Sequence, residues 1–175
     1  MNQSNSDKYF YIYTLLHQIR HATFRIRDKE IQQFGSTSQR VAVIFIAKLL
    51  EGRATPAEIA RWLFRKPNTI SILTNKMAKE GLINKVHDLN RRNHVRIQVT
   101  NKGNTLYNRT LKRISINRIF SCLSDEECDK TIEYLRKIWD RCMKELGDNH
   151  HQVFPIMESI KSAKYNIFEI SDKSE

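Results

Sequence analysis

Residues 55–81 read TPAEIARWLFRKPNTISILTNKMAKEG, and this stretch decides the fold because two helix starts and a helix end follow one another in it. The first start is the clearest in the chain. Thr55 can cap a helix, Pro56 suits its first position, and Glu58 can complete a capping box. A short helix over 56–64 is therefore predicted.

A second helix follows after only a few residues. Pro67 favours its first turn, the apolar spacing continues to Glu80, and Gly81 is expected to end it in a left-handed conformation. Two helices joined by the short segment 64–66 predict a helix-turn-helix, in which the second helix reads the major groove of DNA.

The predicted second helix, at about 67–80, has two distinct faces. Ile70, Leu73 and Met77 recur at helical spacing and are expected to face inward. The residues expected to contact DNA are Lys66, Asn68, Thr69, Ser71, Ile72, Asn75 and Lys76. Asn can pair with adenine, Ser and Thr can contact bases or phosphates, and Ile can touch a thymine methyl group. Taken alone, each of these residue types is found more often on an ordinary solvent-exposed helix face than at a DNA contact.

The apolar period changes from helical to alternating after Gly81. Two strands within about 82–99 are predicted, joined by a polar loop that contains Arg91 and Arg92, with Arg96 on the second strand. Such a hairpin after a helix-turn-helix is a wing, and arginines at its tip suit the narrow minor groove. Which of these arginines enters the groove stays open.

The net charge of +11 is concentrated around these predicted elements. Residues 53–102 contain eleven Lys and Arg against three Asp and Glu, whereas residues 103–175 contain twelve of each. A local excess of positive charge indicates a polyanionic partner, although charge alone also fits a solvated surface. Position, periodicity and charge agree here, which favours nucleic acid.

Long helices are predicted on both sides of this region. They span about 8–31, 38–51, 101–120 and 125–146, and capping boxes are expected at Ser36–Gln39 and Ser124–Glu127. We expect four parts: an N-terminal dimerisation helix (1–35), a winged helix-turn-helix region (36–100), dimerisation helices (101–147) and a C-terminal extension (148–175). The predicted fold class is mainly α with a small β-hairpin wing: a winged helix-turn-helix on a helical dimerisation platform.

Other functional classes are not supported by the sequence. No motif for a nucleophile elbow, a phosphate-binding loop, a zinc-protease helix or a C-x-x-C pair occurs, so an enzyme is not expected. No apolar run approaches the roughly 20 residues of a membrane span, and no signal peptide is evident, which predicts a cytoplasmic protein without membrane contact. No cofactor and no metal site are predicted, because His17 and His21 offer two ligands where zinc takes three or four.

The sequence resembles the MarR family of winged-helix transcription regulators over about residues 8–147. The resemblance is carried by the stretch 55–83, by the hairpin end VRIQVTNKG at 95–103 and by LSDEE at 123–127. It implies a homodimer that binds double-stranded DNA at a pseudo-palindromic operator, usually as a repressor. It also implies release by a small aromatic or lipophilic effector that enters a crevice. The residues that we expect at such a crevice are His17, Arg20, His21, Phe24 and Ile44.

The sequence leaves two alternatives open. The winged helix could bind protein, RNA or DNA without sequence preference. The chain could also be a thiol-based redox sensor, because it contains Cys122, Cys128 and Cys142. Cys142 lies on the apolar stripe of the last predicted helix, so we expect it to be buried.

Overall fold

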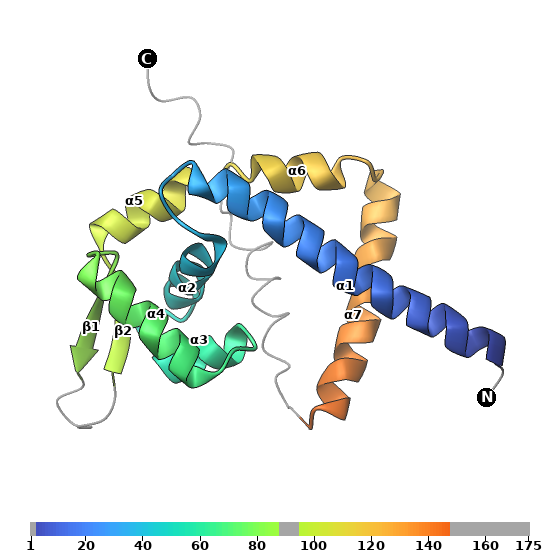
Figure 1. The fold of residues 1–175 in the computed structure, drawn as a ribbon, viewed down its shortest axis with the longest axis horizontal. Coiled ribbons are helices and arrows are strands. Elements are labelled where there is room, and N and C mark those ends of the chain that lie inside the picture. The colour runs from blue at the N-terminus through green and yellow to red at the C-terminus, as the bar shows by residue number, and fades with distance from the viewer. Residues whose placement is uncertain (1–2, 88–94, 148–175) are drawn as a thin grey trace, which may run out of the picture. The chain divides into compact units, whose positions relative to one another are not determined.

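A computed structural model of the chain describes residues 3–87 and 95–147, and its contacts divide the chain into two compact units, Met1–Phe120 and Ser121–Glu175 (Figure 1). The described elements of the first unit are α1 (Gln3–Gln32), α2 (Ser38–Leu49), α3 (Pro56–Trp62), α4 (Pro67–Lys79), β1 (Ile83–His87), β2 (Val95–Val99), α5 (Asn101–Arg109) and α6 (Ile114–Phe120). The second unit contains α7 (Asp125–Glu145). The predicted mainly α fold with one β-hairpin is confirmed. Among the described helices, none combines the length and the apolar character that a membrane crossing requires.

Helix α2 lies at the centre of the first unit. Val43 and Ile44 are fully buried, as the apolar sequence of this helix predicts. The helix begins at Ser38, as predicted, but its N-cap is Thr37 and not Ser36: the Thr37 hydroxyl accepts a hydrogen bond from the Arg40 amide. The carboxylate of Asp28 accepts a further bond from the Ser38 amide at 2.7 Å, which fixes the end of α1 to the start of α2.

The hairpin and the short helices pack around α2 to form one core. Its buried members from α3, α4 and the hairpin include Ile59, Ala60, Ile70, Met77, Leu82, Ile83 and Ile97. Strands β1 and β2 are antiparallel, with Ile83 opposite Val99. The Ile97 amide also donates to the Ala54 oxygen at 2.7 Å, so β2 is bonded to the segment before α3 as well as to β1.

The helix predicted over 101–120 is in fact two helices, α5 and α6. Residues between them leave the helical path, and Arg113 has a positive φ of 47°. The cause is a contact distant in sequence: the Glu30 carboxylate on α1 accepts hydrogen bonds from the amides of Ile114 and Ser115, both at 3.1 Å. Glu30 thus caps α6, and its neighbour Arg27 donates to the Thr110 oxygen at the end of α5.

We predict that Glu30→Gln lowers the free energy of unfolding at neutral pH by about 1.5–3 kcal/mol, the range for hydrogen bonds to a charged group. The Glu30 side chain is only 11% exposed, and Arg27 lies 2.6 Å from its carboxylate. Burial raises the pKa of this carboxyl, but the hydrogen bonds from Ser115 and Arg27 outweigh burial, so the pKa lies below its usual value of 4.5. The stabilisation is therefore present above pH 4.5 and is lost as pH falls through the lowered pKa.

Urea denaturation at pH 7 and at successively lower pH measures this effect. The difference between the wild type and Glu30→Gln should shrink as the pH falls below 4.5. The control is Glu126→Gln on α7, which removes an exposed ion pair with Lys130 and should cost less than about 1 kcal/mol. An equal cost for the two variants at pH 7 would refute the capping role of Glu30.

The second unit begins with the capping box that the sequence predicts. The Ser124 hydroxyl accepts from the Glu127 amide, and the Glu127 carboxylate accepts from the Ser124 amide at 2.8 Å. The expectation for Cys142 was wrong, because this residue is exposed and the neighbouring Met143 is the buried one. Cys122 is also exposed and Cys128 is half-buried.

Candidate nucleic-acid interface

The turn between α3 and α4 sets the position of α4. Phe64 adopts a left-handed conformation with φ of 50°, and the Arg65 amide bonds back to the Ala60 oxygen at 2.9 Å. This closes α3 in the way that helices commonly end. Glu58 does not complete the predicted capping box: Thr55 caps α3 by accepting from the Glu58 amide, and the Glu58 side chain pairs with Arg61.

Helix α4 has the division between faces that the sequence predicts. Ile70 and Met77 are buried, Leu73 is half-buried, and Thr74 joins the inner face. The outer residues that are exposed are Lys66, Asn68, Thr69, Ile72, Asn75 and Lys76. Ser71 is half-buried and so is less accessible than predicted. Ile72 is 63% exposed, so its apolar side chain is accessible from solvent.

The N-terminus of α4 is open toward solvent and positively charged. Lys66 is the N-cap, with extended backbone and no side-chain capping bond, and Pro67 follows it at the first position. The first turn carries no acidic residue. Because a helix N-terminus carries partial positive charge and unpaired amides, this end of α4 suits a phosphate group.

One contact at this surface involves a residue that the sequence analysis did not single out. Lys85 on β1 donates from Nζ to the amide oxygen of Asn75 on α4. The bond fixes the Asn75 side chain and leaves its amide NH₂ group available for a base or a phosphate. Its sequence signal was weak, because Lys85 was visible only as one of several cations near the wing.

The predicted wing is described only at its base. Arg91 and Arg92 lie outside the described residues. Arg96 is exposed on β2, opposite Val86 in the register of the hairpin. The hairpin therefore places at least one predicted wing arginine on β2, which is paired with β1, the strand that packs against α4.

The residues predicted to line a ligand crevice are only partly brought together. Arg20 and Phe24 on α1 line a cavity of about 230 Å³, together with residues of α2 and α4. Ile44 is fully buried in the core, and it is not among the lining residues. His17 and His21 are exposed on α1 and hydrogen-bonded to each other, with 3.3 Å between their Nε2 atoms.

The cavity contains two polar features that the sequence analysis missed. Arg65, from the turn before α4, is part of its wall. The Ser38 hydroxyl is buried and has no hydrogen-bond partner among the described residues. Among the residues that the structure describes, no group of three or more His, Cys, Asp or Glu side chains is arranged to hold a metal ion.

Sequence comparisons give no relatives: no family model matches the chain, and no curated protein does. Solved structures do match. The organohalide-sensing transcriptional regulator RdhR, in its 2,4-dichlorophenol-bound form, is similar with a TM-score of 0.72 and 21% identity, over 87% of this chain and 90% of that one.

Two further similar structures contain DNA. A mutant of MarR from E. coli complexed with operator DNA has a TM-score of 0.69 and 13% identity, over 79% of this chain and 99% of that one. The MepR–DNA complex of S. aureus has a TM-score of 0.66 and 22% identity, over 74% and 96%. A MarR-family regulator from Rhodococcus is similar as well, with a TM-score of 0.67. The chain therefore has the winged-helix fold of the MarR-family transcriptional regulators.

Proposed function

We propose that the protein is a MarR-family transcriptional regulator that binds double-stranded DNA sequence-specifically, with α4 as its recognition helix. The observation that carries the proposal is the outer face of α4. It combines exposed amide, hydroxyl and apolar side chains with lysines at 66 and 76 and an open helix N-terminus. Similar folds in operator-bound structures support the same assignment. As in the family it resembles, repression is the proposed outcome of binding.

The proposal includes a homodimer on a pseudo-palindromic operator. Helix α1 exposes a row of aromatic and aliphatic side chains, namely Tyr9, Phe10, Tyr11, Ile12, Tyr13, Leu15 and Ile19, each at least 41% exposed. Exposed apolar surface of this extent indicates a protein–protein contact. Helix α7 likewise exposes Ile132, Tyr134, Leu135 and Ile138, and its C-cap residue Leu146 is exposed as well. A second copy of the chain is the partner that we propose for both surfaces.

Sedimentation at micromolar concentration tests the homodimer. We expect one species at about twice the 20.7 kDa chain mass. The double variant Phe10→Asp, Tyr13→Asp should shift this species toward monomer, because it places charges in an apolar contact. A wild-type monomer at these concentrations would remove the dimer, and the two-half-site operator with it.

We also propose that a small aromatic or lipophilic effector enters the 230 Å³ cavity beside Arg20 and Phe24. Its walls include Thr69, Ile70 and Leu73 of α4, so a ligand there would contact the recognition helix directly. Such a ligand would shift DNA binding only through different affinities for the free and DNA-bound forms. The Ser38 hydroxyl, which has no hydrogen-bond partner among the described residues, is the proposed hydrogen-bonding group for the ligand.

Base preference separates sequence-specific binding from general affinity for nucleic acid. Asn68→Ala and Asn75→Ala should change which base pairs are preferred at particular operator positions, at about 1–3 kcal/mol per lost base contact. Lysine variants should weaken binding to all sequences alike. Binding measured by fluorescence anisotropy on a panel of single-base operator variants makes this distinction. If the asparagine variants lower affinity uniformly across the panel, α4 is not reading sequence.

A further inference from the structure

Lys85 on β1 lies on the side of the hairpin that faces the core. It is opposite Ile97 in the register of the two strands, and Ile97 is only 1% exposed. Because directly opposite residues of an antiparallel pair project to the same face of the sheet, the aliphatic stem of Lys85 lies on this face too. Lys85 is half-buried, and its ammonium extends to α4, where it donates to the Asn75 oxygen. The Lys85 side chain is therefore held in place at the surface that we propose for DNA.

This bond decides which way the Asn75 amide points. An ammonium group has three donors and no acceptor, so only the oxygen of an amide can face it. The Asn75 oxygen is thus engaged by Lys85, and its NH₂ group is left for another partner. Asn75 is exposed and lies three residues beyond Ile72 on the outer face of α4. To a molecule that approaches this face, the Lys85–Asn75 pair presents donors: the amide NH₂ group and the remaining N–H groups of the ammonium.

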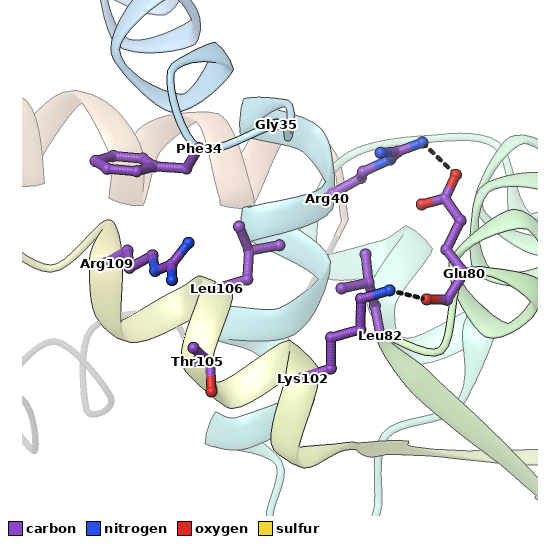
Figure 2. A pocket seen from close by; sticks show the side chains of 9 residues that line it. All are labelled: Phe34, Gly35, Arg40, Glu80, Leu82, Lys102, Thr105, Leu106 and Arg109. Carbon is purple, nitrogen blue, oxygen red and sulfur yellow. Dashed lines mark hydrogen bonds and ion pairs between the residues drawn. The ribbon is translucent and has the colours of Figure 1, made fainter.

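Two contacts hold the end of α4, and with it the start of β1. The Lys102 ammonium on α5 donates to the Glu80 backbone oxygen, and Arg40 on α2 lies 2.8 Å from the Glu80 carboxylate (Figure 2). These residues border a pocket of about 610 Å³ that Phe34 and Arg109 also line. Since β1 begins three residues after Glu80, the same contacts limit the movement of β1 against α4. The two bonded side chains on these elements are therefore positioned before DNA binds, so that little conformational freedom is lost on binding.

We propose that the Lys85–Asn75 pair reads a guanine in the major groove, and that Lys85 determines this preference. The inference rests on the proposed function, because it takes α4 as the recognition helix. The major-groove edge of guanine carries two acceptors, N7 and O6, which match a set of donors. Adenine carries N7 and an amino group, and an unrestrained Asn pairs with both. Here the ammonium on the Asn75 oxygen would face that amino group, so that two donors would oppose each other.

Selection of double-stranded DNA from a random pool with the full chain tests the proposal. Asn75→Ala identifies the operator position that Asn75 contacts, because the base preference is lost there. At that position the wild type should bind guanine at least about 5-fold more tightly than adenine, the lower end of the discrimination by one bidentate contact. Lys85→Met removes the ammonium but keeps the apolar stem, and it should prefer adenine. Fluorescence anisotropy on the guanine and adenine operators measures both preferences.

The matched control is Lys79→Met, which removes the same charge from an exposed lysine in the last turn of α4 and should keep the preference for guanine. Lys85→Met combined with Asn75→Ala should prefer neither base. A wild-type preference for adenine at this position overturns the inference, whether or not Lys85→Met folds. An unchanged preference in Lys85→Met overturns it too, as does an Asn75→Ala variant that alters no operator position. A selection that enriches no sequence would instead overturn the proposed function, on which the inference rests.

Discussion

Gly103→Ala is expected to lower the free energy of unfolding by about 3 kcal/mol, even though Ala ordinarily favours a helix over Gly. A Cβ at this buried position would lie 2.2 Å from the Leu82 backbone oxygen and 2.9 Å from Cγ1 of Val99. The Leu82 oxygen cannot simply move away, because it accepts the Thr100 amide at 3.2 Å at the base of the hairpin. The substitution must therefore displace α5 from the hairpin or break that bond.

Urea denaturation at one fixed protein concentration measures the loss, since the stability of a dimer depends on concentration. Asn108→Ala is the control on the same helix: Asn108 is exposed, and its replacement should change stability by less than about 0.5 kcal/mol. If Gly103→Ala proves as stable as the wild type, then α5 does not approach Leu82 as closely as the structure has it.

Lys66→Ala combined with Lys76→Ala is expected to weaken DNA binding about 100-fold or more near physiological salt. Both lysines are exposed, Lys66 at the N-cap of α4 and Lys76 one turn before its end. In a dimer the double variant removes four cations. If each neutralises one phosphate, the slope of log affinity against log salt falls by about 3 to 4, because each contact contributes about 0.9.

The matched control removes the same number of lysines elsewhere. Lys112→Ala with Lys144→Ala takes two exposed lysines from outside the proposed reading surface and should leave the slope within about 1 of the wild type. Anisotropy titrations between 50 and 300 mM salt give the slopes. An unchanged slope in the Lys66, Lys76 variant would mean that α4 does not lie against the phosphate backbone.

Features set by neighbouring residues were predictable from the sequence. Thr55 before Pro56 starts α3, Gly81 ends α4 with φ of 73°, and the box at Ser124 starts α7. Each depends on side chains and backbone groups within one turn of each other. The inner face of α4 was predictable for the same reason, since helical periodicity alone places Ile70 and Met77 together.

Features set by distant contacts were not predictable. Glu30 caps α6 from 84 residues away in the sequence. No residue pattern within 101–120 predicts that the helix is interrupted there. Ile44 was expected at a crevice, but it is fully buried in the core. Because the run 41–47 is apolar on every side of α2, the sequence does not indicate which of its side chains are buried and which line a crevice. Arg109 and Lys102 resemble any other surface cations in the sequence, and only the fold brings them to the same pocket as Phe34.

Selection of double-stranded DNA from a random pool, at about 150 mM salt, tests the central claim most directly. A dimer that reads sequence with α4 should enrich an inverted repeat, with half-site centres about one helical turn, or 10–10.5 base pairs, apart. Replacing Asn68 by Ala should change the enriched half-site while keeping the symmetry. Enrichment of an asymmetric single site, or of base composition alone, would contradict a dimeric, sequence-reading regulator.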